Sequence, residues 1–384
     1  MEMKTVKIRD LGNIITGSTP FKKNPDNYGG YALWIKPTDI NPEEKYTRVV
    51  EEMFSEKAAH DCRSRLIPAK SICVPCIGTV GTKLTMTPCD CFVNQSINAV
   101  IPNDDYDNDY VYYLLLNFLP NLKSINKGTA SGREYIAKSA FENIELSVHS
   151  NITVQRKIGK ILSAYDDMID NCKRQIALLE EAAQRLYNKW FVDLRFPNHE
   201  TEPIEDNGLP QEWILTSVGS ECTIVTGKKD ANFGGKNGLF PFFTCAQEPI
   251  CANSYSFDQL AIILAGNGDF NVKVYRGKFE AYQRTYVIST HIETNFWLAY
   301  FAIKKSMNTL AVGASGSTIK FLTKGMIENI PFHIPPIEVL SKFNRLCTSY
   351  YNQIENVKSR LARSIESRQF LLSRLISGQI EIQA

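Results

Sequence analysis

The sequence predicts an α/β (α+β) protein in which two similar mixed α/β domains are separated by two long helices, packed as an antiparallel coiled coil with pseudo-twofold symmetry. Three observations predict this fold: a length of 384 residues, a set of short motifs that occurs twice in the same order, and two long stripes of apolar residues. At about 150 residues per domain, this length predicts two or three folded units. The content of hydrophobic residues, 43%, and of charged residues, 22%, is typical of folded globular chains.

The first element of the prediction is an internal repeat, which has to be found before any motif is interpreted. The matched motifs keep their order along the chain, and the first pair has a short insertion in the second copy. The pairs are Leu11-Gly12 and Thr16-Gly17 with Val218-Gly219 and Thr226-Gly227, Cys76-Ile77-Gly78 with Leu264-Ala265-Gly266, Asn94-Gln95-Ser96 with Tyr282-Gln283-Arg284, and Glu142-Asn143-Ile144 with Glu328-Asn329-Ile330.

The repeat divides the chain into four segments. They are a first domain over residues 1–150, a long helix over 151–196, a second domain over 197–335 and a second long helix over 336–384. Each domain contains a β-prone run followed by glycine turns, at 71–74 and at 260–264, which predicts mixed α/β structure with short strands. Pro335-Pro336 ends the last strand and is compatible with the first turn of a helix.

The two helices are predicted from apolar residues that alternate spacings of three and four. The second stripe contains a spacing of four in place of three after Leu361 and continues at Ile365, which predicts a stutter. A helix from about Thr153 to Phe191 is too long for one small domain to bury, so the other helix is its natural partner. The alternative is that each helix covers only its own domain. The predicted helix–helix contacts are Ile158, Leu162, Tyr165, Ile169, Ile176, Leu179, Leu186, Phe343, Tyr350, Ile354, Leu361 and Leu372.

The distribution of apolar and charged residues limits the classes of protein to which the chain can belong. The sequence has no apolar run of membrane-spanning length, and its start lacks the apolar core of a signal peptide, so we expect a cytoplasmic protein with reduced cysteines. The net charge is only +2, and both globular segments are slightly acidic. Any surface for nucleic acid must therefore be local or shared with a partner.

The motifs of common enzymes are absent from the sequence. It contains no phosphate-binding loop, no H-E-x-x-H zinc motif, no G-x-S-x-G elbow and no tetrapeptide of the amino-methyltransferases. A metal-dependent nuclease built on Asp26, Glu43, Glu44 and Lys45 stays open as a weak alternative, since the second repeat has no equivalent.

The cysteines at 73, 76, 89 and 91 have the spacing of a zinc site. We nevertheless expect no metal. Their apparent counterparts, Ala261 for Cys73 and Leu264 for Cys76, are typical strand residues, so buried free thiols are the default interpretation.

The predicted loops contain many polar and basic side chains that suit the binding of nucleic acid. Amides, hydroxyls and guanidinium groups read base edges, whereas lysines and backbone amides hold phosphates. Solvated loop is the commoner role for any single residue of this kind, but their recurrence at matching positions favours a shared function. The candidates are Ser18, Thr19, Lys22, Lys23, Lys36, Thr38, Asp39, Lys83, Asn94, Gln95, Ser131 and Arg133 in the first domain, and Lys228, Lys229, Asn267, Lys273, Tyr282, Gln283, Arg284, Ser315, Ser317, Thr318 and Lys320 in the second.

Over nearly its whole length the chain resembles the DNA specificity subunits of type I restriction-modification systems. The resemblance is carried by the order of several motifs: Ile14-Ile15-Thr16-Gly17-Ser18-Thr19-Pro20, Trp34-Ile35-Lys36-Pro37-Thr38-Asp39-Ile40, Cys76-Ile77-Gly78-Thr79-Val80-Gly81, Asn94-Gln95-Ser96-Ile97, Gln155-Arg156-Lys157-Ile158 through Trp190-Phe191-Val192, Leu209-Pro210-x-x-Trp213, Thr226-Gly227-Lys228-Lys229-Asp230-Ala231 and Ala265-Gly266-Asn267-Gly268.

The resemblance implies a non-catalytic protein that binds double-stranded DNA. It further implies that two adenine-N6 methyltransferase subunits dock on the helices and that restriction and translocase subunits join for cleavage. S-adenosylmethionine, ATP and Mg²⁺ would then be bound by those partners, and this chain would hold no cofactor.

The function predicted from these observations is the reading of a bipartite, asymmetric DNA target, with the helices setting the gap between two half-sites. Domains that face the same side of the duplex should read half-sites about 10 base pairs apart, and a central helix longer by about four residues should change the gap. The alternative from another class is a coiled-coil adaptor that binds only proteins.

Overall fold

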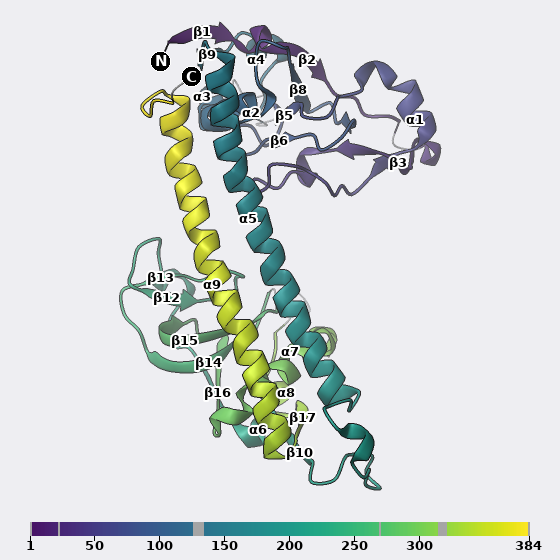
Figure 1. Cartoon of the computed structure of the whole chain (residues 1–384), viewed down its shortest axis with the longest axis vertical. Coiled ribbons are helices and arrows are strands. Elements are labelled where there is room, and N and C mark those ends of the chain that lie inside the picture. The colour runs from purple at the N-terminus through teal and green to yellow at the C-terminus, as the bar shows by residue number, and fades with distance from the viewer. Residues whose placement is uncertain (1, 22–23, 126–133, 269, 314–320, 383–384) are drawn as a thin grey trace. The chain divides into compact units, whose positions relative to one another are not determined.

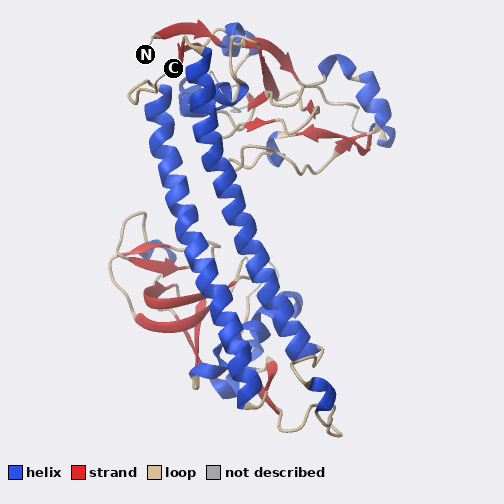
Figure 2. Cartoon of the chain, in the orientation of Figure 1, coloured by secondary structure: helices blue, strands red, loops and turns tan. Residues whose placement is uncertain are grey.

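The chain forms two compact units, and each contains part of both long helices. Unit 1 comprises Met1–Gln175 and Val357–Ala384, and unit 2 comprises Ile176–Asn356. The computed structural model describes residues 2–21, 24–125, 134–268, 270–313 and 321–382. Each unit thus takes in residues from both the domain and the helix segments expected from the sequence. Figure 1 traces the elements along the chain, and Figure 2 shows the mixture of helices and strands in each unit.

In the part of unit 1 that the structure describes, there are three small sheets and four short α-helices besides its parts of the long helices. The sheets, in strand order, are β2 (Gly12–Thr16), β8 (Ile97–Pro102), β5 (Ile72–Pro75) and β6 (Thr85–Met86); then β4 (Met53–Phe54), β3 (Tyr28–Ile35) and β7 (Phe92–Val93); then β1 (Met3–Lys7) and β9 (Glu145–His149). The short helices are α1 (Glu56–Asp61), α2 (Asn108–Phe118), α3 (Leu122–Ile125) and α4 (Lys138–Glu142).

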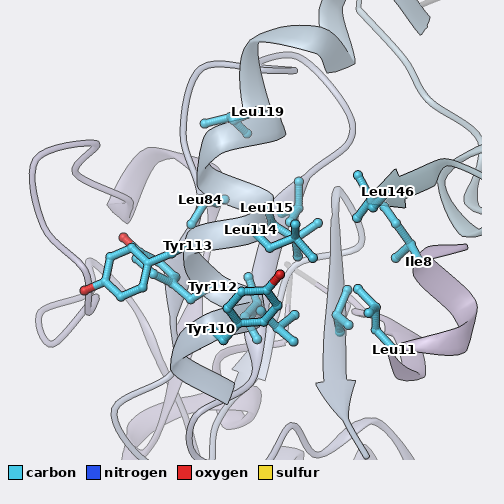
Figure 3. Close-up of a cluster of buried hydrophobic side chains, with 14 of the residues drawn as sticks. Ile8, Leu11, Leu84, Tyr110, Tyr112, Tyr113, Leu114, Leu115, Leu119 and Leu146 are labelled. Atoms are coloured by element: carbon cyan, nitrogen blue, oxygen red, sulfur yellow. The ribbon is translucent and has the colours of Figure 1, made fainter. Parts of the chain in front are cut away.

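The core of unit 1 lies around α2, because this helix buries residues on most of its circumference. Tyr110, Tyr113 and Leu114 are fully or almost fully buried, and they lie with Leu11 and Leu146 in one cluster (Figure 3). The Asp107 side chain accepts a hydrogen bond from the Tyr110 N–H at 2.9 Å and so caps the first turn.

Unit 2 repeats this architecture with a more continuous sheet. Its strands, in sheet order, are β11 (Cys222–Thr226), β16 (Thr285–Thr290), β14 (Phe257–Ala265), β15 (Val272–Ala281), β12 (Phe240–Phe243) and β13 (Ile250–Ala252), with β10 (Ile214–Ser217) and β17 (Pro331–Ile334) as a separate pair. Its short helices are α6 (Val218–Glu221), α7 (Phe296–Gly313) and α8 (Lys324–Glu328).

The strand registers show how the two copies correspond and correct two of the predicted matches. The Ile8 N–H donates to the Ile144 carbonyl at 3.0 Å, and the Val218 N–H donates to the Ile330 carbonyl at 2.9 Å. Val218 is therefore the counterpart of Ile8 rather than of Leu11. The predicted short insertion is therefore wrong. It was inferred because both Leu11 and Val218 precede a glycine, but the hydrogen bonds show that these two residues are not equivalent.

The second correction concerns the glycine turn after β5. The Ile136 N–H donates to the Cys76 carbonyl, and the Leu322 N–H donates in the same way to the Gly266 carbonyl. Cys76 thus corresponds to Gly266, and Gly78 corresponds to Gly268; both glycines have positive φ, +85° and +68°. The predicted match of Cys76 with Leu264 is wrong because the connection from this turn to the next strand is slightly longer in the first copy.

The two long helices are α5 (Ile152–Tyr187), which continues into a π-helical turn over Asn188–Val192, and α9 (Ile337–Ile376). The Leu340 N–H donates to the Pro336 carbonyl, so the proline pair lies at the start of α9 as predicted.

Inside each unit the two helices run antiparallel. In unit 1, Gln175 contacts Arg360 and Met168 contacts Ser364, whereas in unit 2 the rings of Tyr187 and Phe343 lie 6.3 Å apart. The alternative in which each helix covers only its own domain is therefore wrong.

The stutter predicted in α9 is also wrong. Ser364, not Ile365, is the buried residue after Leu361, so the three-and-four alternation continues. Its hydroxyl donates to the Arg360 carbonyl at 2.8 Å, which lets a polar residue occupy the stripe. The sequence pattern missed this position because it counted only apolar residues.

The next polar member of the stripe belongs to a buried ionic cluster. Arg368 contacts Asp166 of α5, and Asp166 also accepts a hydrogen bond from the Tyr113 hydroxyl. Burial, followed by the neighbouring carboxylate, raises the pKa of Tyr113 far above its ordinary value. Because Tyr113 comes from α2, the cluster fixes the first domain to both helices.

Among the described residues, no helix is both long and apolar enough to cross a membrane.

Candidate nucleic-acid interface

The predicted polar residues of unit 1 gather where β3 and β7 end. These two strands are parallel, so the residues that follow them lie at one edge of the sheet. Asn94 donates from Nδ2 to the Thr19 hydroxyl at 3.2 Å, while its Oδ1 accepts the Ser96 N–H at 2.7 Å. Gln95 is exposed beside it. The result is an ordered set of amide and hydroxyl groups at the surface.

Gly17 makes this arrangement possible. A Cβ atom on Gly17 would lie 2.1 Å from the Val93 carbonyl oxygen, which no side chain can accommodate. The Ser18 N–H donates to that same carbonyl at 3.0 Å. The absent side chain therefore lets the loop that carries Ser18 and Thr19 pack directly on the loop that carries Asn94. The Ser18 hydroxyl itself is buried and has no hydrogen-bond partner among the described residues.

Unit 2 builds the same arrangement with other side chains. A Cβ atom on Gly227 would lie 2.0 Å from the Ala281 carbonyl oxygen. Lys229 and Tyr282 form a parallel bridge, in the position where unit 1 has Thr19 and Asn94. Lys228, Gln283 and Arg284 are exposed around it. Gln283 and Arg284 also line a pocket of about 340 Å³ together with Thr226, Gly266 and Tyr286.

A second group of candidates is occupied by contacts within the protein. Lys36 binds Glu51 at 2.7 Å and Glu52 at 2.8 Å, and its side chain is only 15% exposed. Burial opposes its charge, but the two carboxylates together raise the pKa of Lys36. Asp39 accepts the Lys36 N–H at 2.8 Å, whereas Thr38 is exposed. Lys36 and Asp39 therefore shape this loop more than they offer groups to a ligand.

Three further candidates stand apart from both groups. Lys83 donates to the Ile40 carbonyl at 3.3 Å, and Asn267 forms a bridge with Phe321 after β14. Lys273 donates to the Ala246 carbonyl at 2.8 Å and contacts Asn271, and burial lowers its pKa. The two lysines thus point at carbonyl groups of the protein.

Eight candidates lie outside the described residues: Lys22, Lys23, Ser131, Arg133, Ser315, Ser317, Thr318 and Lys320.

The structure adds one residue that the sequence search missed. Arg65 donates to the Thr16 carbonyl at 3.2 Å, directly before Gly17, so its guanidinium lies beside the Ser18–Thr19 loop. Arg63 and Arg65 lie close together in the sequence, which could have indicated a site that binds phosphate or bases. Nothing in the sequence, however, placed Arg65 beside Gly17.

The predicted helix-contact residues are placed along both helices with different burial. Within unit 1 or unit 2, the buried ones are Ile158, Leu162, Ile169, Phe343 and Ile354. The half-buried ones are Tyr165, Ile176, Leu179, Leu186, Tyr350, Leu361 and Leu372.

The structure does not assemble the alternative catalytic or metal sites. Asp26 lies near Lys57, Glu43 pairs with Lys173 at 3.1 Å, and Lys45 is buried against Asp109. In the described parts of the chain, no group of three or more His, Cys, Asp or Glu residues is arranged to hold a metal ion.

The four clustered cysteines differ in environment. Cys89 is exposed, whereas Cys73, Cys76 and Cys91 are buried. Burial raises the pKa of Cys73 and of Cys76 to about 12, as expected of thiols packed in a core. In the corrected register the counterpart of Cys73 is Ile263, which is also a buried strand residue.

Comparison with known proteins places this chain in a family. The family model described as the type I restriction modification DNA specificity domain matches it twice, over residues 1–181 and 210–366. The chain is 26% identical to the type I restriction enzyme MjaIX specificity subunit of Methanocaldococcus jannaschii, over 98% of this chain and 93% of that protein. It is 36% identical to the EcoDI specificity subunit of Escherichia coli, over 45% of this chain and 39% of that protein.

A solved structure supports the fold. The crystal structure of the type I restriction-modification S subunit of M. genitalium matches with a TM-score of 0.64 at 15% identity, covering 100% of this chain and 97% of that one. Together with the family match over both copies of the repeat, these observations show that the chain belongs to the DNA specificity subunits of type I restriction-modification systems.

Proposed function

We propose that each unit reads one half of a bipartite DNA sequence through the surface beside its close-packed glycine, Gly17 in unit 1 and Gly227 in unit 2. The observation that carries this proposal is that the two units share a backbone arrangement but differ in the side chains that it presents. A common scaffold with Thr19 and Asn94 in one copy, and Lys229 and Tyr282 in the other, suits two half-sites of different sequence.

The chemistry of the two surfaces fits base reading supported by phosphate contacts. The exposed amide group of Gln95 matches the donor and acceptor pair of adenine, and the guanidinium groups of Arg65 and Arg284 match the acceptors of guanine or a phosphate. Lys228 is exposed and suits a phosphate. With a net charge of only +2, the chain gains DNA affinity from these local groups and from its partners.

In this proposal the chain supplies DNA sequence recognition and performs no catalysis. Two adenine-N6 methyltransferase subunits dock on α5 and α9, and restriction subunits complete the assembly. S-adenosylmethionine, ATP and Mg²⁺ are held by those partners. The helices act as a spacer that fixes the gap between the two half-sites.

The test is to co-express the chain with its methyltransferase subunit and to map methylated adenines in host DNA. We expect one bipartite sequence to be methylated. Gln95→Ala should relax specificity in one half, and Gln283→Ala in the other half. Purified chain, with and without the methyltransferase, should bind duplex DNA with an affinity that falls steeply with salt. Methylation without a bipartite motif, or loss of both half-sites in either variant, would contradict the proposal.

A further inference from the structure

Unit 2 contains a pocket that the candidate DNA interface does not use. Its volume is about 490 Å³, and it lies among β15, the start of α7 and the N-terminal half of α9. Figure 1 shows β14 and β15 beside α9. Val274 and Tyr275 line it from the sheet, and Trp297 and Tyr351 line it from the helices, with their rings stacked 4.3 Å apart. The pocket thus combines a strand with an aromatic wall.

In unit 1 the corresponding position is filled by the chain itself. Tyr46 forms a parallel bridge with Met86 of β6, and the Met86 N–H donates to the Lys45 carbonyl at 2.8 Å. The Lys45 side chain is only 3% exposed, and its ammonium group donates to Asp109 of α2 at 2.5 Å and to Ser163 of α5 at 2.8 Å. The segment 45–47 therefore adds to the edge of the sheet and fills the space up to the helices.

The strand registers establish that these two positions correspond. Ile72 pairs with both Met86 and Val100, and Ile262 pairs with both Val274 and Ile288. Val274 of β15 is thus the counterpart of Met86 of β6. When α5 and α9 are aligned at their first residues, Ile152 and Ile337, Thr348 of the pocket corresponds to Ser163 and Glu355 corresponds to Asp170.

The difference between the units comes from one loop. In unit 1 the connection from β3 to β4 spans residues 36–52 and carries the filling segment, whereas in unit 2 the connection from β12 to β13 spans only 244–249. β12 pairs with β15 only at Glu280 and Ala281. Of the described residues, none forms a bridge with the outer edge of β15 over 272–278. This edge is open to a further strand, as sheet edges that bind peptides are.

We propose that the pocket of unit 2 binds an extended segment of a partner polypeptide, which adds along β15 as residues 45–47 add along β6. Tyr300 of α7 contacts Tyr351 as Tyr113 of α2 contacts Asp166, the counterpart of Tyr351 in α5. Phe296 therefore lines the pocket at the position of Asp109, so an apolar residue replaces Lys45 in the bound segment. An aromatic residue follows in the place of Tyr46, against Trp297 and Tyr351.

Charge complementarity defines the rest of the segment. In unit 1, a guanidinium nitrogen of Arg48 lies 3.7 Å from a carboxylate oxygen of Asp170. The guanidinium carbon lies over the Tyr46 ring, 4.9 Å from its centroid. Glu355 holds the position of Asp170 at the pocket of unit 2, so the bound segment carries a basic residue two positions after its aromatic one. The partner is a protein of the proposed complex, but the inference does not depend on how the loops read DNA.

The test uses the full chain and a fluorescent peptide with the sequence of residues 41–50 carrying Lys45→Leu. We expect saturable binding by fluorescence anisotropy. Glu355→Lys in the protein should weaken binding about fivefold, and Arg48→Glu in the peptide should do the same, since each replaces an ion pair with like charges. Combining the two changes should restore the affinity to within about twofold.

The matched control is Glu338→Lys, which makes the same charge change at an exposed position of α9 outside the pocket. It should leave peptide binding unchanged. The proposal is overturned if the peptide shows no saturable binding, if Glu338→Lys weakens it as much as Glu355→Lys, or if the combined charge exchange fails to restore it. None of these outcomes involves DNA, so they are distinct from failure of the proposed DNA reading.

Discussion

Gly17 and Gly227 show how a single missing side chain sets the geometry of the candidate interface. Each lies with its Cα against a backbone carbonyl, so that the neighbouring loops share hydrogen bonds. We expect Gly17→Ala to destabilise unit 1 by roughly 1–3 kcal/mol, because the added methyl group must push the loop of Asn94 away. Chemical denaturation measures this change, and methylation mapping should show relaxed specificity in one half-site only.

The control for this variant is Gly30→Ala, since a Cβ atom there would meet nothing within 4 Å. Equal loss of stability in the two variants would show that the close approach at Gly17 is not responsible.

A second residue-scale prediction concerns the buried pair of Arg368 and Asp166. The side chains are 16% and 7% exposed, and Asp166 also accepts from Tyr113. Arg368→Met should destabilise unit 1 by about 3–5 kcal/mol, because it leaves a buried carboxylate without its cation. Adding Asp166→Leu to this variant should recover part of the loss. Arg363→Met, at an exposed position of the same helix, serves as the control; no recovery in the double variant would contradict the explanation.

The sequence identifies the polar residues of the candidate interface but not the contacts that they make within the protein. The match of Asn94-Gln95 with Tyr282-Gln283 identified equivalent loops, because both precede the central strand of a repeated sheet. It could not reveal that Lys36 is held by Glu51 and Glu52, since these carboxylates are distant in the chain. Arg65 was missed for the same reason.

At the scale of the element, the end of α9 is part of the core of unit 1. Leu375 and Ile376 are buried in the cluster around α2, and the Leu375 carbonyl lies 2.8 Å from Nε2 of His149. We expect Leu375→Ala to cost unit 1 about 2–5 kcal/mol and to leave unit 2 unchanged, because it opens a cavity in one core only. Hydrogen exchange resolved by segment distinguishes the two units.

The control for that prediction is Phe370→Ala, a larger truncation on the same helix at a residue that is 54% exposed. Loss of protection in unit 2, or an equal loss with Phe370→Ala, would count against a local effect.

Both long helices were predictable because their apolar stripes are long and regular. The α5 prediction from about Thr153 to Phe191 matches the helix Ile152–Tyr187 and its π-helical turn. What could not be predicted is the polar part of the stripe, Ser364 and Arg368, since a search for apolar periodicity ignores polar residues whose partners come from another element.

At the scale of the whole molecule, the pairing of the two helices determines how the proposed spacer can be altered. Both units contain a segment of each helix, so the change expected from the sequence, about four residues added to the central helix alone, would break the pairing. Inserting seven residues after Gln175 and seven after Asn356 preserves the stripes and adds about 10 Å of helix. We expect the gap in the DNA target to lengthen while both half-sites stay unchanged, because the two recognition surfaces are left intact.

Methylation mapping of this double insertion checks the spacer directly. The matched comparison is the same insertion in α5 alone, which should abolish methylation rather than shift the gap. An unchanged gap in the double insertion would show that the helices do not set it.

The division of unit 1 between two distant stretches of sequence affects how the protein is made. Its strands leave the ribosome first, but its core lacks Leu375 and Ile376 until residues 357–384 have been translated. Unit 2 lies wholly between these stretches, so all of its residues are synthesised before the last core residues of unit 1. A chain that ends between Asn356 and Leu375 would therefore contain all of unit 2 but only part of the core of unit 1, and we expect unit 1 of such a chain to be open to proteolysis.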